Sequence, residues 1–89
     1  MEQDHVRQVE ETVIGLVEKQ GGVASADLTR ATHFRDDLNF DSLDLVELTM
    51  ALEESFGFTI SDVDAEPLQT VGALVDYVVE RTRSAAAGA

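Results

Sequence analysis

Cysteine is missing from this 89-residue sequence, and proline occurs only once. Without cysteine the chain has no disulfide framework, no thiol nucleophile and no cysteine ligands for zinc or an iron–sulfur cluster. No apolar run approaches the roughly 18 residues that a membrane-spanning helix needs, and nothing resembles a secretory signal. We therefore expect a soluble, cytoplasmic protein whose stability comes from packing alone.

Basic residues are missing from the middle of the chain. Residues 36–80 contain twelve acidic side chains and no Lys or Arg, and the net charge of the whole chain is −12. The negative electrostatic field of these side chains repels nucleic acid and anionic membranes. It attracts basic protein surfaces over a Debye length of about 8 Å at physiological salt. We expect basic protein partners, although the acidity also has a simpler interpretation as an aid to solubility.

A chain of this length forms one small domain, which buries only about 60% of the surface that its unfolded chain exposes. We expect this domain to span residues 1–83. The remaining residues 84–89, SAAAGA, have nothing large to bury and are expected to form a disordered tail.

Apolar residues recur at helical spacing near both ends of this domain. The first helix is expected from about residue 4 to Lys19, where Gly21 and Gly22 end it, and its apolar stripe is Val6, Val9, Val13, Leu16 and Val17. The last helix is expected to follow a cap at Thr70, and its apolar face is Val71, Leu74, Val75 and Val78.

The second helix is expected from Ser42 to about Phe56, with Asp41 or Ser42 as its cap and Gly57 at its end. A short helix is expected at 62–66, stopped by Pro67. Residues 23–41 form a long loop whose spaced apolar residues can pin it to the core: Val23, Leu28, Phe34 and Leu38. These elements predict an all-α fold, a small bundle of three main helices plus one short helix, with a long loop between helices 1 and 2.

The second helix carries two apolar stripes. One is an ordinary core face, made by Leu45, Leu48, Thr49, Leu52 and Phe56. The other lies roughly 140° away around the helix at about 100° per residue, and consists of Leu43, Val46 and Met50. Because exposed apolar residues ringed by acids are typical of docking sites, we expect partners to bind here, unless segment 62–66 or loop 23–41 covers the stripe.

Ser42 is the candidate for chemistry, and three chemical roles compete with simple helix capping. A hydrolase nucleophile elbow requires glycine where Phe40 and Asp44 stand, although His5 and His33 are available as bases. The carboxylates of DVDAE at 62–66 lack the glycine and the glutamate of a calcium-binding loop, so no metal site is expected. Attachment of a phosphodiester remains open, because a helix N-terminus favours an anion while the neighbouring Asp residues oppose it.

The stretch DDLNFDSLDLVELTMALEESFGFTI, together with the later DAEPLQTVGALVDYV, resembles the acyl carrier proteins of type II fatty acid and polyketide synthesis. The family signature is Asp-Ser-Leu followed by an acidic helix. This resemblance implies that Ser42 receives 4′-phosphopantetheine from coenzyme A through a phosphopantetheinyl transferase. Ser42 is then an acceptor rather than a catalyst, and the thiol of the arm carries acyl groups as thioesters.

The resemblance also implies roles for the two faces of the second helix. The face that partner enzymes contact would comprise Asp41, Leu43, Asp44, Val46, Glu47, Met50, Glu53 and Glu54. The residues expected to line a path for the acyl chain are Leu48, Leu52, Phe56, Ile60, Leu68, Val71 and Leu74. The expected partners are ketosynthases, acyltransferases and related enzymes with basic patches, and the carrier itself is expected to be a monomer.

Three positions depart from the common pattern of fatty acid carriers: Asn39 stands in place of Gly, Phe40 in place of a small or aliphatic residue, and Ser61 in place of Pro. Asn39 tolerates a left-handed backbone. With the aromatic residue Phe40 at this position, the chain resembles polyketide carriers. We expect Phe40 to affect how the arm is presented, so both pathways stay open. A second hypothesis is an unmodified acidic helical module that binds a basic protein through the Leu43, Val46 and Met50 stripe.

Overall fold

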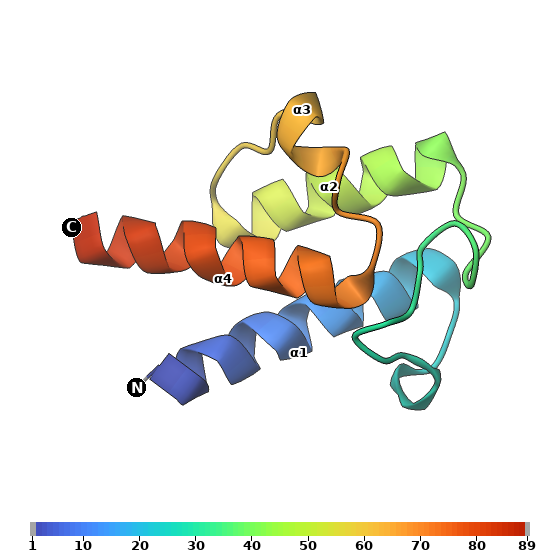
Figure 1. Cartoon of the computed structure of the whole chain (residues 1–89), viewed down its shortest axis with the longest axis horizontal. Helices are drawn as coiled ribbons and strands as arrows, with labels where there is room; N and C mark the ends of the chain where they lie inside the picture. Colours follow the sequence, from blue (N-terminus) through green and yellow to red (C-terminus); the bar gives the residue numbers. More distant parts are fainter. Residues whose placement is uncertain (1, 89) are drawn as a thin grey trace.

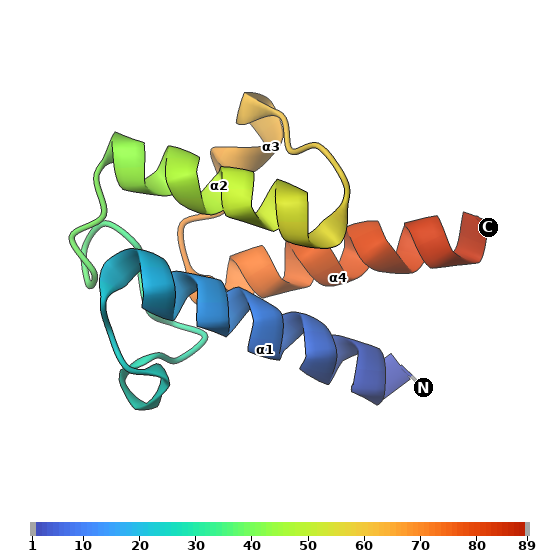
Figure 2. The same ribbon diagram turned by 180° about the vertical axis from the view of Figure 1, so that it is seen from behind.

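The computed structural model describes the backbone of residues 2–88 and the side chains of residues 3–83. Its elements are α1 (Glu2–Gly21), the single-turn 3-10 helix η1 (Ser25–Asp27), α2 (Ser42–Phe56), α3 (Asp62–Ala65) and α4 (Val71–Gly88). Helices α2 and α4 both run against the direction of α1, so the two chain ends lie at the same end of the bundle (Figures 1 and 2). The predicted fold class is confirmed, while η1 was not anticipated.

Helix α1 continues two residues beyond the predicted end. Gly21 still belongs to the helix, and Gly22 adopts the left-handed conformation (φ 64°) that ends it. Gly21 is required for another reason, because a Cβ atom there would lie 2.8 Å from Cε1 of Phe40. The aromatic ring of Phe40 therefore packs directly against the backbone at the end of α1.

Helix α2 begins and ends as the sequence predicts, and the structure decides between its two candidate caps. Asp41 is the N-cap, and its side chain accepts a hydrogen bond from the Asp44 backbone nitrogen (2.9 Å). The Asp44 carboxylate in turn accepts from the Asp41 backbone nitrogen (3.1 Å), which completes a capping box. Gly57 closes the helix in the left-handed conformation, with φ 76°.

The long loop between α1 and α2 is fixed to the start of α4 by backbone hydrogen bonds. Val71 donates to Thr32 (3.0 Å), and Gly72 donates to Arg30 (2.9 Å). The Phe34 nitrogen also donates to the Gln69 carbonyl (2.9 Å), so the Phe34 ring is carried into the core, where it is only 2% exposed. The predicted pinning of the loop by apolar side chains is confirmed, since Leu28 is also buried and Val23 and Leu38 pack against the core.

Helix α3 is a single turn with no buried residue. Ser61 caps it by accepting from the Asp64 nitrogen (3.1 Å). Thr70 begins α4 in the predicted way, because its hydroxyl accepts from the Ala73 nitrogen (3.2 Å). The backbone of α4 extends to Gly88, but the side chains of residues 84–89 lie outside those that the structure describes, so the expected disordered tail stays a prediction.

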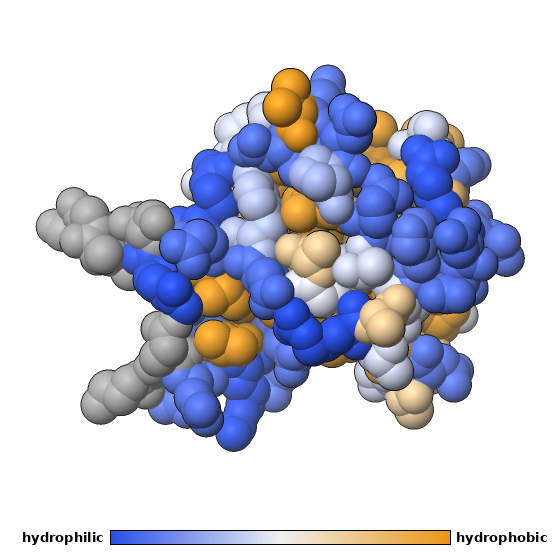
Figure 3. All heavy atoms as spheres, viewed as in Figure 1, coloured by the Kyte–Doolittle hydropathy of each residue, from blue (hydrophilic) through white to orange (hydrophobic). Residues whose placement is uncertain are grey.

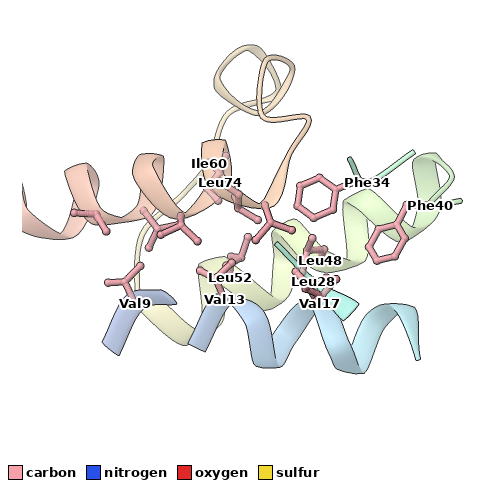
Figure 4. Close-up of a cluster of buried hydrophobic side chains, with 14 residues drawn as sticks. Val9, Val13, Val17, Leu28, Phe34, Phe40, Leu48, Leu52, Ile60 and Leu74 are labelled. Carbon is pink, nitrogen blue, oxygen red and sulfur yellow. The ribbon is translucent and has the colours of Figure 1, made fainter. Parts of the chain in front are cut away.

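The core lies between α1, α2 and α4 (Figure 4). Val9, Val13 and Val17 project from α1 into it, and all three are at most 2% exposed. They meet the buried residues of α2, Leu48 and Leu52, and those of α4, which are Val71, Leu74, Val75, Val78 and Val79. Burial of each large apolar side chain contributes about 1.5–3 kcal/mol, so this contact fixes the position of α2 and of everything that it carries on its outer side.

Candidate functional site

Ser42 is the first residue of α2, and its side chain is exposed to solvent. The preceding residue, Asp41, performs the capping, so the Ser42 hydroxyl is not needed for it. Among the residues whose side chains the structure describes, none forms a hydrogen bond with this hydroxyl. The structure thus presents a free alcohol at a rigid helix start, and the role of helix cap belongs to Asp41.

The electrostatic setting of Ser42 combines a helix N-terminus with two carboxylates. Donation from the Asp44 backbone nitrogen lowers the pKa of Asp41 below its ordinary value, which keeps this carboxylate charged. The second carboxylate, Asp44, is held by the Asp41 backbone nitrogen. Both charges are already engaged with the first turn of the helix, where the dipole favours them.

The second apolar stripe of α2 is exposed. Leu43 is 64% exposed, Val46 54% and Met50 60%. The alternative that segment 62–66 or loop 23–41 covers this stripe is therefore wrong, because three neighbouring apolar side chains remain in contact with water. Among the acids near the stripe, Glu47 and Glu54 are exposed, whereas the Glu53 carboxylate is half-buried and accepts from the Ile60 backbone nitrogen (2.8 Å).

Beside this stripe lies a contact that no sequence pattern predicts. The side-chain amide of Gln20, in the last turn of α1, donates to Glu47 (2.8 Å) and to Asp44 (3.3 Å). Residues so distant in the chain come together only because α1 and α2 pack antiparallel. The acidic edge of α2, formed by Asp44 and Glu47, is therefore in contact with α1.

A cavity of about 410 Å³ opens between α2, α3 and the start of α4, and Ser42, Val46 and Met50 are among its lining residues. Hydrophobic residues show at the place of α3, where Val63 is 80% exposed, and again below α3 toward α4, with hydrophilic residues around them (Figure 3). Five of the seven residues expected along an acyl path do line this cavity: Leu48, Leu52, Ile60, Leu68 and Leu74.

The other two expected lining residues, Phe56 and Val71, do not line the cavity. Phe56 lies near the end of α2, where its ring stacks on Phe58 with centroids 6.3 Å apart. Val71 is 1% exposed and is packed into the core. Helical spacing placed both on the apolar side of their helices, but it cannot separate residues that face a neighbouring helix from residues that face a cavity.

The two histidines form hydrogen bonds with residues other than Ser42. His5 lies in the first part of α1 and shares a hydrogen bond with the Thr82 hydroxyl of α4 (2.7 Å). His33 lies in the loop, where its ring accepts from the Asp36 backbone nitrogen (3.4 Å). Neither ring forms a hydrogen bond with the Ser42 hydroxyl, so there is no nucleophile and base pair. Within the described residues, no group of three or more His, Asp or Glu side chains is arranged to hold a metal ion.

Comparison with known proteins accounts for the free hydroxyl at the start of an acidic helix. The model of the family described as "Phosphopantetheine attachment site" matches residues 11–78. The acyl carrier protein of Chlamydia muridarum (strain MoPn / Nigg) is 48% identical over 73 residues, which make up 82% of this chain and 95% of that relative. The chain belongs to the acyl carrier protein family.

An acyl carrier protein carries covalently attached 4′-phosphopantetheine and is a carrier rather than an enzyme. It works with biosynthetic enzymes, and a transferase attaches its arm. The match spans the region from the middle of α1 to α4 and includes every residue discussed around Ser42. Within the described residues of this carrier, no helix is both long enough and apolar enough to cross a membrane.

Proposed function

We propose that Ser42 is the residue to which the phosphopantetheine arm is attached, and that the surface made by Leu43, Val46, Met50 and the neighbouring acids is where partner enzymes dock. The observation that carries the first proposal is the free, exposed hydroxyl of Ser42. Because Asp41 caps the helix, this hydroxyl is not needed for capping. The Asp-Ser-Leu signature at residues 41–43 supports the same residue.

The residues around Ser42 fit an attached phosphodiester. The N-terminus of α2 favours a negative charge, and the hydroxyl stands in solvent where a transferase can reach it. In the transfer, the Ser42 oxygen would form a bond to the phosphorus of coenzyme A that bears the pantetheine unit, and the bond from this phosphorus to the bridging oxygen of the diphosphate would break. Adenosine 3′,5′-bisphosphate would leave, and the Ser42 proton would pass to a base of the transferase. When attached, the arm supplies a thiol that holds acyl groups as thioesters.

The cavity beside Ser42 supports a role in sheltering an acyl chain. Its deeper residues, which include Leu52, Ile60 and Leu74, are buried and apolar. Each methylene group transferred from water to such surroundings gains about 0.8 kcal/mol. We therefore assign Leu48, Leu52, Ile60, Leu68 and Leu74 to the binding of the acyl chain.

The docking proposal rests on the exposure of the stripe and on charge. Three apolar side chains on one face of α2 are more than half exposed, and acidic residues stand beside them. An enzyme with a basic patch around an apolar depression, such as a ketosynthase or an acyltransferase, matches this surface. Docking can remain weak, because a tethered intermediate is held near its enzyme at an effective concentration of roughly millimolar.

The finer assignments follow from the same resemblance. We infer a cytoplasmic monomer that serves fatty acid or polyketide assembly, and neither pathway is favoured over the other by a contact in the structure. The alternative of an unmodified acidic module is not favoured, because the family match and the acyl carrier relative both point to a modified protein. The choice between them depends on whether Ser42 becomes modified.

Mass spectrometry tests the attachment directly. The chain is incubated with coenzyme A and a phosphopantetheinyl transferase, and we expect a gain of one phosphopantetheine per molecule. Ser42→Ala should gain nothing, whereas Ser61→Ala should be modified like the wild type, because Ser61 is also an exposed serine at a helix start but only caps α3. No gain in the wild type, or a gain that persists in Ser42→Ala, contradicts the assignment.

A further inference from the structure

The end of α1 touches the acidic edge of α2 through one side chain, that of Gln20. Its Nε2 atom lies 2.8 Å from Glu47 Oε1 and 3.3 Å from Asp44 Oδ1. Ionised carboxylates only accept hydrogen bonds, so the amide must turn its two N–H groups toward them. Each of the two hydrogens thus serves a different carboxylate.

The amide of Gln20 fixes two charges that would otherwise repel each other. Asp44 and Glu47 are three positions apart on α2, so their side chains are neighbours on the helix surface, where like charges are unfavourable. Asp44 is held from two directions, by the Asp41 backbone nitrogen on Oδ2 and by Gln20 on Oδ1. Glu47 is exposed, and Gln20 is the only hydrogen-bonding partner of its side chain among the described residues.

The same arrangement leaves an acceptor for a partner. The Gln20 carbonyl oxygen has no hydrogen-bond donor among the described side chains, and it lies on the same amide that bridges the two carboxylates. Two anionic groups and one neutral acceptor are therefore held together at the junction of α1 and α2. A cationic side chain with several N–H groups, such as arginine, fits such a cluster.

We propose that Gln20 is a positioning residue of the docking surface, which extends from α2 onto the end of α1 and there receives a basic side chain of the docking enzyme. The inference rests on the proposed function, because it concerns the enzymes that dock beside Ser42. Gln20 acts by ordering Glu47 and Asp44 before the partner arrives, so less side-chain freedom is lost on binding.

The first experiment separates docking from chemistry. Gln20→Met retains the length of the side chain and removes its donors. Gln8→Met is the control, since Gln8 is exposed on the same helix and its side chain forms no hydrogen bond with α2 among the described residues. With apo protein and a phosphopantetheinyl transferase, we expect Gln20→Met to raise KM about two- to tenfold, which corresponds to the ordering cost of one long side chain. We expect kcat to remain at the wild-type value, and Gln8→Met to change neither constant.

The second experiment tests the route through Glu47. NMR couplings across the side-chain bonds of Glu47 should report one dominant rotamer in the wild type and averaged rotamers in Gln20→Met. In a Glu47→Gln background, the change at Gln20 should have a smaller effect on KM than it has in the wild type. Equal effects in both backgrounds, or unchanged Glu47 couplings, overturn the positioning role.

The two proposals fail in different ways. If the wild-type chain itself is not modified, the proposed function is wrong. If the wild type is modified while Gln20→Met and Gln20→Ala both keep the wild-type KM, the attachment site stands and only the inference on Gln20 is wrong. Helicity measured on each variant ensures that a raised KM does not come from an unfolded chain.

Discussion

The ring of Phe40 stacks on the ring of Phe34, with centroids 5.8 Å apart and planes inclined by 28° (Figure 4). Phe40 is only 4% exposed, and it also meets the backbone at Gly21. Its side chain therefore points into the core rather than toward solvent beside Ser42. Phe34, on which it stacks, is among the residues that line the cavity beside Ser42.

Truncation of Phe40 should destabilise the whole domain. Phe40→Ala removes a buried ring between α1 and the loop, and replacements of this kind cost about 3–5 kcal/mol. Phe40→Leu should cost less because it leaves a smaller cavity. Urea unfolding followed by circular dichroism measures both, with exposed Met50→Ala as the control. A loss in Phe40→Ala no larger than that of the control would contradict the packing described.

Tyr77 should ionise at a higher pH than an ordinary tyrosine. Its partial burial and its hydrogen bond to Asp64 (3.0 Å) raise the pKa of Tyr77 above the usual value of about 10, although Arg81 opposes this. Because the pKa is raised on folding, the contribution of Tyr77 to stability is complete below pH 10 or so and is lost as the pH rises through the folded pKa. Tyr77 is the only tyrosine and the chain has no tryptophan, so phenolate absorbance follows it alone.

The neighbours of Tyr77 give this titration its controls. Asp64→Asn should move the pKa down toward the ordinary value, because the carboxylate stabilises the protonated phenol. Arg81→Gln should move it up, since the guanidinium donates to the phenol oxygen (2.6 Å) and favours the phenolate. Asp62→Asn, in the same short helix, should leave it unchanged. Shifts of opposite sign to these would mean that the contacts to Tyr77 do not form in solution.

The ionised carboxylate of Asp41 should stabilise the folded protein, and this stabilisation should be lost at acidic pH. Its pKa is lowered by donation from the Asp44 backbone nitrogen, so the contribution is present above the ordinary value of about 3.9 and is lost as the pH falls through the folded pKa. Asp41→Asn retains an oxygen for capping but cannot titrate. The free energy of unfolding of the wild type relative to that of Asp41→Asn, measured by urea unfolding at a series of pH values, should therefore fall as the pH drops below this range. Parallel curves for the two proteins would exclude the predicted linkage.

Changes on the exposed stripe should affect partners and spare the fold. Met50→Ala and Glu47→Lys should each reduce turnover by partner enzymes, the first by removing apolar contact and the second by placing a positive charge before a basic patch. Exposed substitutions usually change stability by no more than about 0.5 kcal/mol, so helicity and thermal unfolding should remain close to wild type. Collapse of either variant would mean that the stripe belongs to the core.

Local patterns were sufficient for much of this fold. The stripe of Val9, Val13 and Val17 predicted α1, and Gly57 predicted the end of α2, because helical period and left-handed glycines act over a few residues. The separate stripe at Leu43, Val46 and Met50 was predicted in the same way, and its exposure is confirmed. Asn39 was expected to tolerate a left-handed backbone, and its φ is 59°.

What spacing could not supply are the contacts between segments. The burial of Phe40 against Gly21 and the bridge from Gln20 to Glu47 depend on how two parts of the chain meet in space. The exclusion of Phe56 and Val71 from the cavity has the same origin. The sequence by itself determined which faces of each helix are apolar, because that follows from period and side-chain chemistry. Only the tertiary structure decided which of those faces meet each other, a cavity or water, because helix packing brings together residues whose separation along the chain carries no signal.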